Sequence, residues 1–322
     1  MAQSTKQALL AALSAAEGGY ISGQQLAEAL GVSRAAIHKA ALALTAQGYA
    51  LDSAPRRGYR LAGGDPFCAE AVGEYPAPIY IYDTLESSNL TAKQLALAGA
   101  PHGTLVLAGQ QKAGRGRLGR RFESPAGKGV YCSLLLRPAL SAADAQTATI
   151  AAAVSVARAV KALCGLELGI KWVNDLYYQG KKVCGILTEA ALDLESGMLD
   201  YAVLGLGFNV AAPADGWPED LRDVAGALYD SSPAPGARAA LAAAFLNAFW
   251  PLYRAGPRSG YLDEYRRRQA LTGQRVLVTP RRGTPRAAQV QGIDDECKLV
   301  VRFDGESRPA ALNSGEVSVR LL

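Results

Sequence analysis

A cluster of breaker residues, Gly63-Gly64-Asp65-Pro66, prevents the chain from running through this point as one helix or strand. Glycine and proline interrupt both kinds of regular structure, so the cluster predicts a domain boundary. The chain has 322 residues, which is enough for two or three domains that each bury a core. We therefore predict domains at 1–64, 65–272 and 273–322, the last beginning where short strands become frequent.

The first domain has the pattern of a winged helix-turn-helix. Ser22 and Gln25 have the spacing of a capping box, in which each side chain bonds the backbone of the other. Gly31 suits a left-handed turn at the end of the short helix that follows. A helix, a glycine turn and a second helix are typical of this motif. The predicted elements are helices at 5–16, 22–30 and 33–46 and a two-stranded wing at 49–52 and 58–61.

The remaining sequence predicts an α+β domain followed by a small β-barrel. Gln179-Gly180 and Ser196-Gly197 are typical hairpin turns, so the later strands of the central domain are expected to pair antiparallel. Helices packed on this mixed or antiparallel sheet define the α+β class. Its predicted strands are 79–83, 104–109, 130–136, 168–173, 176–178, 181–191 and 198–206, with helices at 87–99 and 142–163. The barrel strands are predicted at 275–279, 288–293, 299–303 and 317–321.

Composition excludes several classes of protein. The five cysteines are scattered without a Cys-x-x-Cys pair and there are two histidines, which argues against a zinc or disulfide framework and for reduced thiols in a cytoplasm. The N-terminus lacks the features of a secretory signal. No continuous run approaches the eighteen apolar residues of a membrane span, so no membrane is expected. The net charge of +5 permits an anionic partner.

Residues 110–121 are rich in glycine and arginine and follow a predicted strand. Gly114, Gly116 and Gly119 have the spacing of a dinucleotide-binding loop, but that loop must open a helix, and this segment continues as loop. A Walker A loop is also excluded, because Lys128 is followed by glycine. Two interpretations remain open: a loop whose guanidinium groups bind phosphate or carboxylate, and a solvated basic loop or nucleic-acid contact.

Two further stretches have both a structural and a functional interpretation. Lys182 opens a strand shortly after the Asn174-Asp175 pair, and it is either a surface charge with a buried stem or a cation for a bound anion. The segment 205–209, Gly-Leu-Gly-Phe-Asn, allows close backbone approach beside one polar side chain, or simple packing.

Five short motifs occur in a fixed order along the chain. They are Ser87-Ser88-Asn89, Gln111-x-x-Gly-Arg-Gly-Arg117, Lys-Trp-x-Asn-Asp-Leu176, Lys182-x-x-Gly-Ile-Leu187 and Gly-x-Gly-x-Asn209. This order resembles that of the biotin–protein ligases, and the winged helix resembles that of their repressor subclass. The closing Gly315-Glu-Val-Ser-Val-Arg320 is similar to the end of that family's SH3-like domain. Phe122 stands where many relatives have tryptophan, and Val173 where proline is common.

The resemblance implies a class II synthetase-like ligase domain that forms biotinyl-5′-AMP from biotin and ATP with Mg²⁺. The biotinyl group would pass to a lysine of the biotin carboxyl carrier protein of acetyl-CoA carboxylase. Lys182, Arg117 and Arg115 would be the catalytic cations, and Asp175 a Mg²⁺ contact. The implied biotin-binding residues are Ser87, Ser88, Asn89, Gln111, Arg115, Gly116, Arg117, Lys182, Gly185, Gly205 and Gly207. The implied ATP-binding residues are Arg117, Arg120, Phe122, Asn174, Asp175, Lys182 and Asn209.

The resemblance also implies a repressor of biotin synthesis genes that dimerises on operator DNA when the adenylate is bound. The recognition helix would be Ser33–Gln47, and the wing would contact phosphates. The predicted DNA contacts are Ser33, Arg34, Ala35, His38, Lys39, Arg56 and Arg57. Three alternatives remain: a winged helix used for protein contacts, a ligand-sensing transcription factor without catalysis, and a ligase that has lost operator binding.

Overall fold

The computed structural model describes residues 5–46, 49–63, 72–137, 144–192, 199–230, 236–256, 260–281, 283–314 and 317–322. The chain forms two compact units, Met1–Glu74 with Ser231–Ala240, and Tyr75–Asp230 with Leu241–Leu322. Some predicted features lie outside the described residues: the 64–66 part of the first boundary, the Ser196-Gly197 turn and Gly315-Glu316. The division into three domains stays a prediction.

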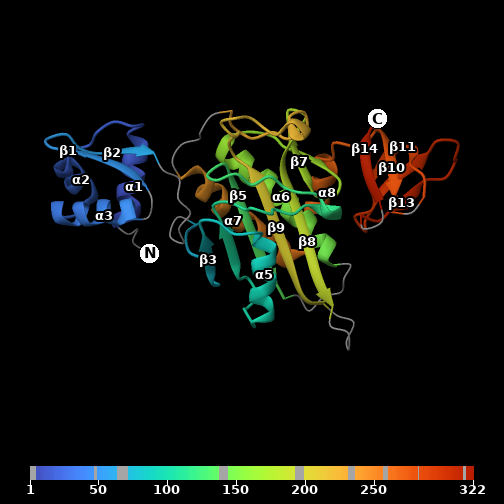
Figure 1. The fold of residues 1–322 in the computed structure, drawn as a ribbon, viewed down its shortest axis with the longest axis horizontal. Coiled ribbons are helices and arrows are strands. Elements are labelled where there is room, and N and C mark those ends of the chain that lie inside the picture. Colours follow the sequence, from blue (N-terminus) through green and yellow to red (C-terminus); the bar gives the residue numbers. More distant parts are fainter. Residues whose placement is uncertain are drawn as a thin grey trace. The chain divides into compact units, whose positions relative to one another are not determined.

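The first unit is a winged helix-turn-helix, as predicted (Figure 1, blue). Ser22 Oγ accepts a hydrogen bond from the Gln25 N–H at 3.1 Å, and the Gln25 side chain accepts from the Ser22 N–H, so the capping box is confirmed. Gly31 ends the short helix with φ 64°. Its elements are α1 (Thr5–Ala15), α2 (Gly23–Leu30), α3 (Arg34–Ala46), β1 (Ala50–Ala54) and β2 (Gly58–Gly63). Buried Leu9, Leu26 and Ile37 join the three helices in one core.

The second unit is built on a seven-stranded sheet in the order β3-β4-β5-β9-β8-β7-β6 (Figure 1). β3 and β4 are parallel and the other neighbouring strands are antiparallel, so the predicted mixed sheet is confirmed. The strands are β3 (Ile79–Tyr82), β4 (Leu105–Ala108), β5 (Gly129–Leu136), β6 (Gly169–Lys171), β7 (Asp175–Tyr178), β8 (Lys181–Leu192) and β9 (Leu199–Asn209).

Two helices cover opposite faces of this sheet. On β8, Glu189 bonds to Asn89 of α5 (Ser88–Leu97), whereas its neighbour Thr188 bonds to Thr149 of α6 (Asp144–Cys164). Because successive strand residues point to opposite faces, α5 and α6 lie on different sides. α5 therefore has the predicted serine and asparagine residues at its N-terminus directly above the sheet.

Among the described residues, one helical segment, Gln146–Cys164 of α6, has the length and mean hydropathy (1.4) of a membrane span. The segment contains Arg158 and Lys161, so it is not a continuous apolar run. The share of this segment buried inside the structure is 67%, because the helix packs along the sheet. This burial is typical of the core helix of a globular domain.

The last strands form a five-stranded antiparallel sheet in the order β13-β12-β11-β10-β14, in agreement with the predicted SH3-like domain. Its strands are β10 (Arg275–Pro280), β11 (Arg286–Ile293), β12 (Leu299–Phe303), β13 (Ala310–Leu312) and β14 (Val317–Leu321). β13 was not predicted, nor were α7 (Ala237–Ala255) and α8 (Tyr261–Arg267). The Cys297 carbonyl accepts hydrogen bonds from Trp172 Nε1 at 3.0 Å and Gln146 Nε2 at 2.8 Å, which join this domain to the central one.

Candidate active site

A cavity of about 610 Å³ lies over β8 and β9 in the second unit. Segments that are far apart in the sequence meet there, from the start of α5 to the last strand, β14. All the residues predicted for biotin or ATP line this cavity: Ser87, Ser88, Asn89, Gln111, Arg115, Gly116, Arg117, Arg120, Phe122, Asn174, Asp175, Lys182, Gly185, Gly205, Gly207 and Asn209. The structure thus brings them to one place, and their individual roles stay predictions.

The glycine- and arginine-rich segment forms a narrow hairpin at the cavity. The Gly116 N–H donates to the Arg120 carbonyl at 2.7 Å, and the Phe122 N–H donates to the Gly114 carbonyl at 2.9 Å. A short 3₁₀ turn, Arg117–Gly119, forms the tip. A Cβ atom on Gly114 would lie 2.3 Å from the Phe122 carbonyl oxygen, so only glycine fits there. The segment does not open a helix: residues 122–128 are loop and the next element is β5. This agrees with our exclusion of a dinucleotide-binding loop.

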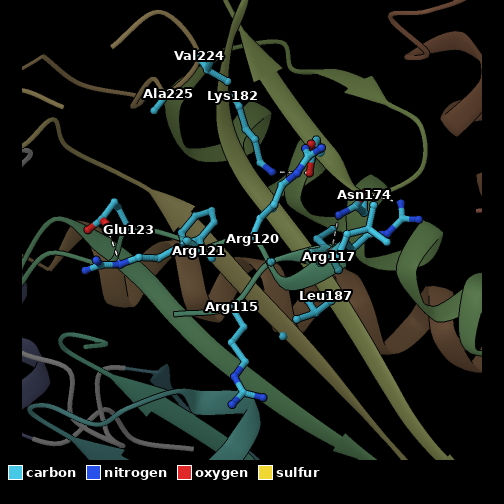
Figure 2. Close-up of a pocket in the computed structure, with 18 of the residues that line it drawn as sticks. Arg115, Arg117, Arg120, Arg121, Glu123, Asn174, Lys182, Leu187, Val224 and Ala225 are labelled. Carbon is cyan, nitrogen blue, oxygen red and sulfur yellow. Dashed lines mark hydrogen bonds and ion pairs between the residues drawn. The ribbon is translucent and has the colours of Figure 1, made fainter. Parts of the chain in front are cut away.

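Positive charge gathers in one part of the cavity. Lys182 Nζ lies 2.6 Å from Asp175 Oδ1, an ion pair whose angles fall outside those of a hydrogen bond. Figure 2 shows Arg120 and Lys182 directed toward the same region, with Arg115 pointing the opposite way. Burial lowers the pKa of Lys171; Asp175 opposes this effect, and the charges of Lys182, Arg120 and Arg320 add to it. One carboxylate thus faces several cations, an arrangement that favours a bound anion.

Arg117 lies beside the part of the cavity wall that comes from the C-terminal domain. It donates to Asn174 Oδ1 at 3.2 Å and to the Ser314 carbonyl. Asn174 is itself held, because its Nδ2 donates to the Ile186 carbonyl at 2.7 Å. Burial lowers the pKa of Arg117, although an arginine remains charged in a protein. The guanidinium is therefore a fixed charge with defined partners.

The Phe122 ring packs on two glycines of the sheet, which have no side chains there. Gly185 and Gly207 are direct partners across β8 and β9. A Cβ atom on Gly207 would lie 2.5 Å from the ring, and one on Gly185 would lie 3.3 Å from it. The two glycines therefore leave the space that the ring occupies, and the ring offers an aromatic face to the cavity.

Asn209 ends β9 with one half of its amide unpaired. Its Nδ2 donates to the Gly226 carbonyl at 3.0 Å. Its Oδ1 is buried and has no hydrogen-bond partner among the described residues, and the residue is 5% exposed. A buried acceptor without a donor is costly, so a ligand N–H group would stabilise this end of the cavity.

Sequence analysis missed several polar residues that do not line the cavity but contact the residues that line its other end. Ser133 of β5 and Glu189 of β8 contact Asn89, and Lys93 of α5 pairs with Glu189. Ser124 accepts from Gln111 Nε2 at 2.9 Å. No pattern marks Ser133 inside its apolar strand, and Glu189 lies two residues beyond the Lys182-x-x-Gly-Ile-Leu187 motif.

In the first unit, the predicted DNA contacts lie on the recognition helix and the wing. Arg34, Ala35, His38 and Lys39 are exposed on α3, and their spacing puts them on one face. Their helix is capped by Ser33, whose Oγ accepts from the Ala36 N–H at 3.1 Å. In the wing, Arg56 is exposed and the Arg57 guanidinium lies over the Tyr20 ring at 4.2 Å. His38 Nδ1 lies 3.1 Å from the Tyr59 hydroxyl, so this histidine is joined to the wing.

Comparison with known proteins gives the same two parts. The Biotin/lipoate A/B protein ligase family matches residues 82–209, and an HTH domain matches residues 5–60. The "Bifunctional ligase/repressor BirA" of Bacillus spizizenii is 36% identical over 239 residues, or 72% of this chain and 73% of the relative. That of Bacillus subtilis is 35% identical over 242 residues, with the same shares.

Solved structures are similar in fold. A biotin protein ligase from Aquifex aeolicus, in complex with biotin and ATP, has a TM-score of 0.63 at 24% identity and covers 76% of this chain and 99% of its own. The sheet, the cavity and the hairpin beside it define a ligase domain of the biotin/lipoate class. The chain belongs to the family of bifunctional biotin–protein ligases and repressors.

Proposed function

We propose that the protein is a biotin–[acetyl-CoA-carboxylase] ligase that forms biotinyl-5′-AMP from biotin and ATP. The observation that carries this proposal is the cluster of cations, Lys182, Arg120 and Lys171, around one carboxylate in a cavity lined by all the predicted residues. The biotin/lipoate ligase match and the relatives named bifunctional ligase/repressor support it.

The first half-reaction brings two anions together. A biotin carboxylate oxygen attacks the α-phosphorus of ATP, and the bond to pyrophosphate breaks, so pyrophosphate leaves with the electron pair. Lys182 and Arg117 would offset the repulsion between carboxylate and phosphate, and Arg120 would offset charge on the nucleotide. The protein needs no nucleophile, because positioning and electrostatic stabilisation lower the barrier.

The second half-reaction uses the adenylate as an acylating agent. The amine of a lysine on the biotin carboxyl carrier protein attacks the acyl carbon, an amide bond forms, the amine loses a proton and AMP leaves. The adenylate is a mixed anhydride that water can hydrolyse, so the 114–122 hairpin would protect it by excluding water. Phe122 and the unpaired Asn209 Oδ1 provide an aromatic face and an acceptor for adenine.

Mg²⁺ fits this cavity as an ion that comes with the nucleotide. The described residues contain no group of three or more histidine, cysteine, aspartate or glutamate side chains that could hold a metal alone. Magnesium is usually bound by one or two carboxylates together with substrate phosphates. Asp175 would be the protein contact, and the ion would supply charge neutralisation at the phosphates.

We also propose that the first unit binds operator DNA and represses biotin synthesis genes. The HTH match and the exposed Arg34 and Lys39 on the recognition helix support this. A single module of this kind reads a short half-site, so we expect a homodimer on two half-sites. If the adenylate favours the dimer, DNA binding must in turn favour the adenylate. The buried thiols of Cys132, Cys184 and Cys297 are free, which suits a reducing cytoplasm.

The direct test is adenylate formation without a carrier. The full chain is incubated with biotin, Mg²⁺ and ATP labelled at the α-phosphate, and the products are separated by chromatography. We expect labelled biotinyl-5′-AMP and an equal amount of pyrophosphate. Binding of biotin and ATP without either product would instead identify a ligand-sensing transcription factor without catalysis.

A further inference from the structure

Glu189 fixes the orientation of the Asn89 amide. Asn89 Nδ2 donates to Glu189 Oε2 at 2.8 Å and to the Leu187 carbonyl at 3.2 Å. Lys93 Nζ lies 2.5 Å from Glu189 Oε1. Burial alone would raise the pKa of Glu189, but hydrogen bonds from Lys93 and Asn89, with the charges of Lys93 and Arg115, hold it below its usual value. An ionised carboxylate only accepts hydrogen bonds, so the NH₂ group of Asn89 faces Glu189 and its oxygen faces away.

The orientation of Gln111 is fixed from the other side. Its Oε1 accepts from the Ser88 N–H at 2.8 Å, and a backbone N–H can only donate. Its Nε2 donates to Ser124 Oγ at 2.9 Å, and the Ser124 hydroxyl donates to the Phe122 carbonyl at 3.1 Å. The Gln111 oxygen therefore faces Ser88 as an acceptor.

Two serine hydroxyls connect these two fixed oxygens. Ser133 Oγ lies 2.6 Å from Asn89 Oδ1 and 2.8 Å from Ser88 Oγ, and Ser88 Oγ lies 3.0 Å from Gln111 Oε1. The chain thus contains three oxygen–oxygen contacts but only two hydroxyl protons, because each serine carries one. Since both ends must accept, the network lacks one hydrogen in every arrangement of its protons.

The missing hydrogen has a place in the cavity. Ser88, Asn89 and Gln111 line it, whereas Ser133 is buried behind them. A ligand N–H group beside Ser88 and Gln111 would supply the missing donor, and a ligand without one would leave buried acceptors unpaired. The matching family covers both biotin and lipoate ligases. Biotin has two ureido N–H groups and lipoate has none.

We propose that Glu189 is a positioning residue that selects an acid with a ring N–H donor, such as biotin, over an acid without one, such as lipoate. It does so by holding the Asn89 oxygen toward Ser133, which keeps the network one hydrogen short. This inference rests on the proposed function, in which biotin occupies this end of the cavity. With glutamine at 189, the new amide keeps its oxygen toward Lys93 and presents its NH₂ group to Asn89, which favours a turned Asn89 amide that donates to Ser133. The 3.2 Å contact with the Leu187 carbonyl opposes this turn, so the requirement for a ligand donor is relaxed but not abolished.

The test measures binding of two acids to the full chain by calorimetry at neutral pH without ATP. The acids are biotin and its cyclic carbonate analogue, in which both ureido N–H groups are replaced by oxygen. For the unsubstituted protein we expect the analogue to bind about 10- to 100-fold more weakly, as for a buried acceptor left without a donor. In Glu189→Gln we expect weaker biotin binding. We also expect the ratio of the two dissociation constants, that of the analogue divided by that of biotin, to fall several-fold toward one.

A second variant approaches the network from the other side. Ser133→Ala removes one hydroxyl proton and two of the three oxygen–oxygen contacts. One contact, Ser88 to Gln111, and one hydroxyl proton remain, so no hydrogen is missing and the ratio of dissociation constants should fall here as well. This variant keeps the inference open to contradiction if Glu189→Gln does not fold. The matched control is Glu264→Gln, because Glu264 also pairs with basic side chains, Arg158 and Arg268, but does not line the cavity. Its ratio should equal that of the unsubstituted protein.

A ratio unchanged in both Glu189→Gln and Ser133→Ala would overturn the inference and leave Glu189 a structural residue, even if both acids bind more weakly. That result would not affect the proposed function. Failure of the unsubstituted protein to bind biotin would overturn the proposed function and this inference together.

Discussion

Lys182 Nζ lies 2.6 Å from Asp175 Oδ1, so the cation at the start of β8 is held by the carboxylate at the start of β7. The pair is about three-quarters buried, and neighbouring cations outnumber this carboxylate. Lys182 is thus held at the cavity before an anion arrives. Of the two interpretations that the sequence left open, a surface charge or a cation for a bound anion, this position favours the second.

Lys182→Ala should reduce adenylate formation by about 100-fold or more, because it removes a fixed charge that stabilises the transition state. Its circular dichroism spectrum should be unchanged. The control is Lys181→Ala, since Lys181 is exposed, donates to the Arg222 carbonyl and does not line the cavity. Equal rates of adenylate formation for the two variants would show that Lys182 is only a surface charge.

Gly207→Ala should raise the KM for ATP by about tenfold, because its Cβ would lie 2.5 Å from the Phe122 ring and displace the aromatic face. The control is Gly169→Ala in β6, where the new Cβ would lie 3.6 Å from Ala270 Cβ, an ordinary contact. Steady-state kinetics on both variants make the measurement. A KM for ATP that does not change in Gly207→Ala would contradict a role for the Phe122 ring at the nucleotide.

ATP affinity should fall as pH rises, and the fall should occur at a lower pH than that at which a free lysine loses its charge. Burial lowers the pKa of Lys171 from 10.5, so its charge is lost at a lower pH than that. A phosphate bound nearby favours the charged form, so affinity is full well below the lowered pKa and decreases as pH rises through it. Lys171→Arg should make the profile flatter, because a guanidinium keeps its charge. Superimposable profiles for the two proteins between pH 7 and pH 10 would exclude Lys171 from ATP binding.

Arg34→Ala and Lys39→Ala should each weaken binding to the biotin-operon promoter. Each loss of a phosphate contact should also reduce the slope of affinity against salt concentration by about one unit. Gel shifts over a range of salt concentrations, with biotin and ATP present, measure both effects. Lys161→Ala is the control, since Lys161 pairs with Glu167 in the second unit. Variants that bind DNA like the control would favour a winged helix used for protein contacts.

Local signals in the sequence predicted much of this fold. The Ser22–Gln25 capping box depends only on neighbouring residues, and so does the turn at Gln179 and Gly180, whose φ angles are 48° and 78°. The parallel pairing of β3 with β4 was not predictable in this way, because it joins strands separated by a helix. The helices α7 and α8 were missed outright.

For the site, the ordered motifs predicted which residues meet, but not how they pair. In the sequence, Ser133 is one small residue in a buried strand. Its role in the hydrogen-bond network follows from its contact with Asn89, which joins β5 to α5. The contact of Arg117 with the Ser314 carbonyl joins residues far apart in the chain. Such partners are determined by tertiary packing, which no local pattern encodes.

The most direct measurement of the central claim is transfer of labelled biotin to a biotin carboxyl carrier domain. The full chain is incubated with labelled biotin, ATP, Mg²⁺ and the carrier, and the label is followed by mass spectrometry. We expect label on one carrier lysine, dependent on ATP and strongly reduced in Lys182→Ala. A carrier that remains unlabelled, with a folded protein and ATP in excess, would contradict the assignment of this chain as a ligase.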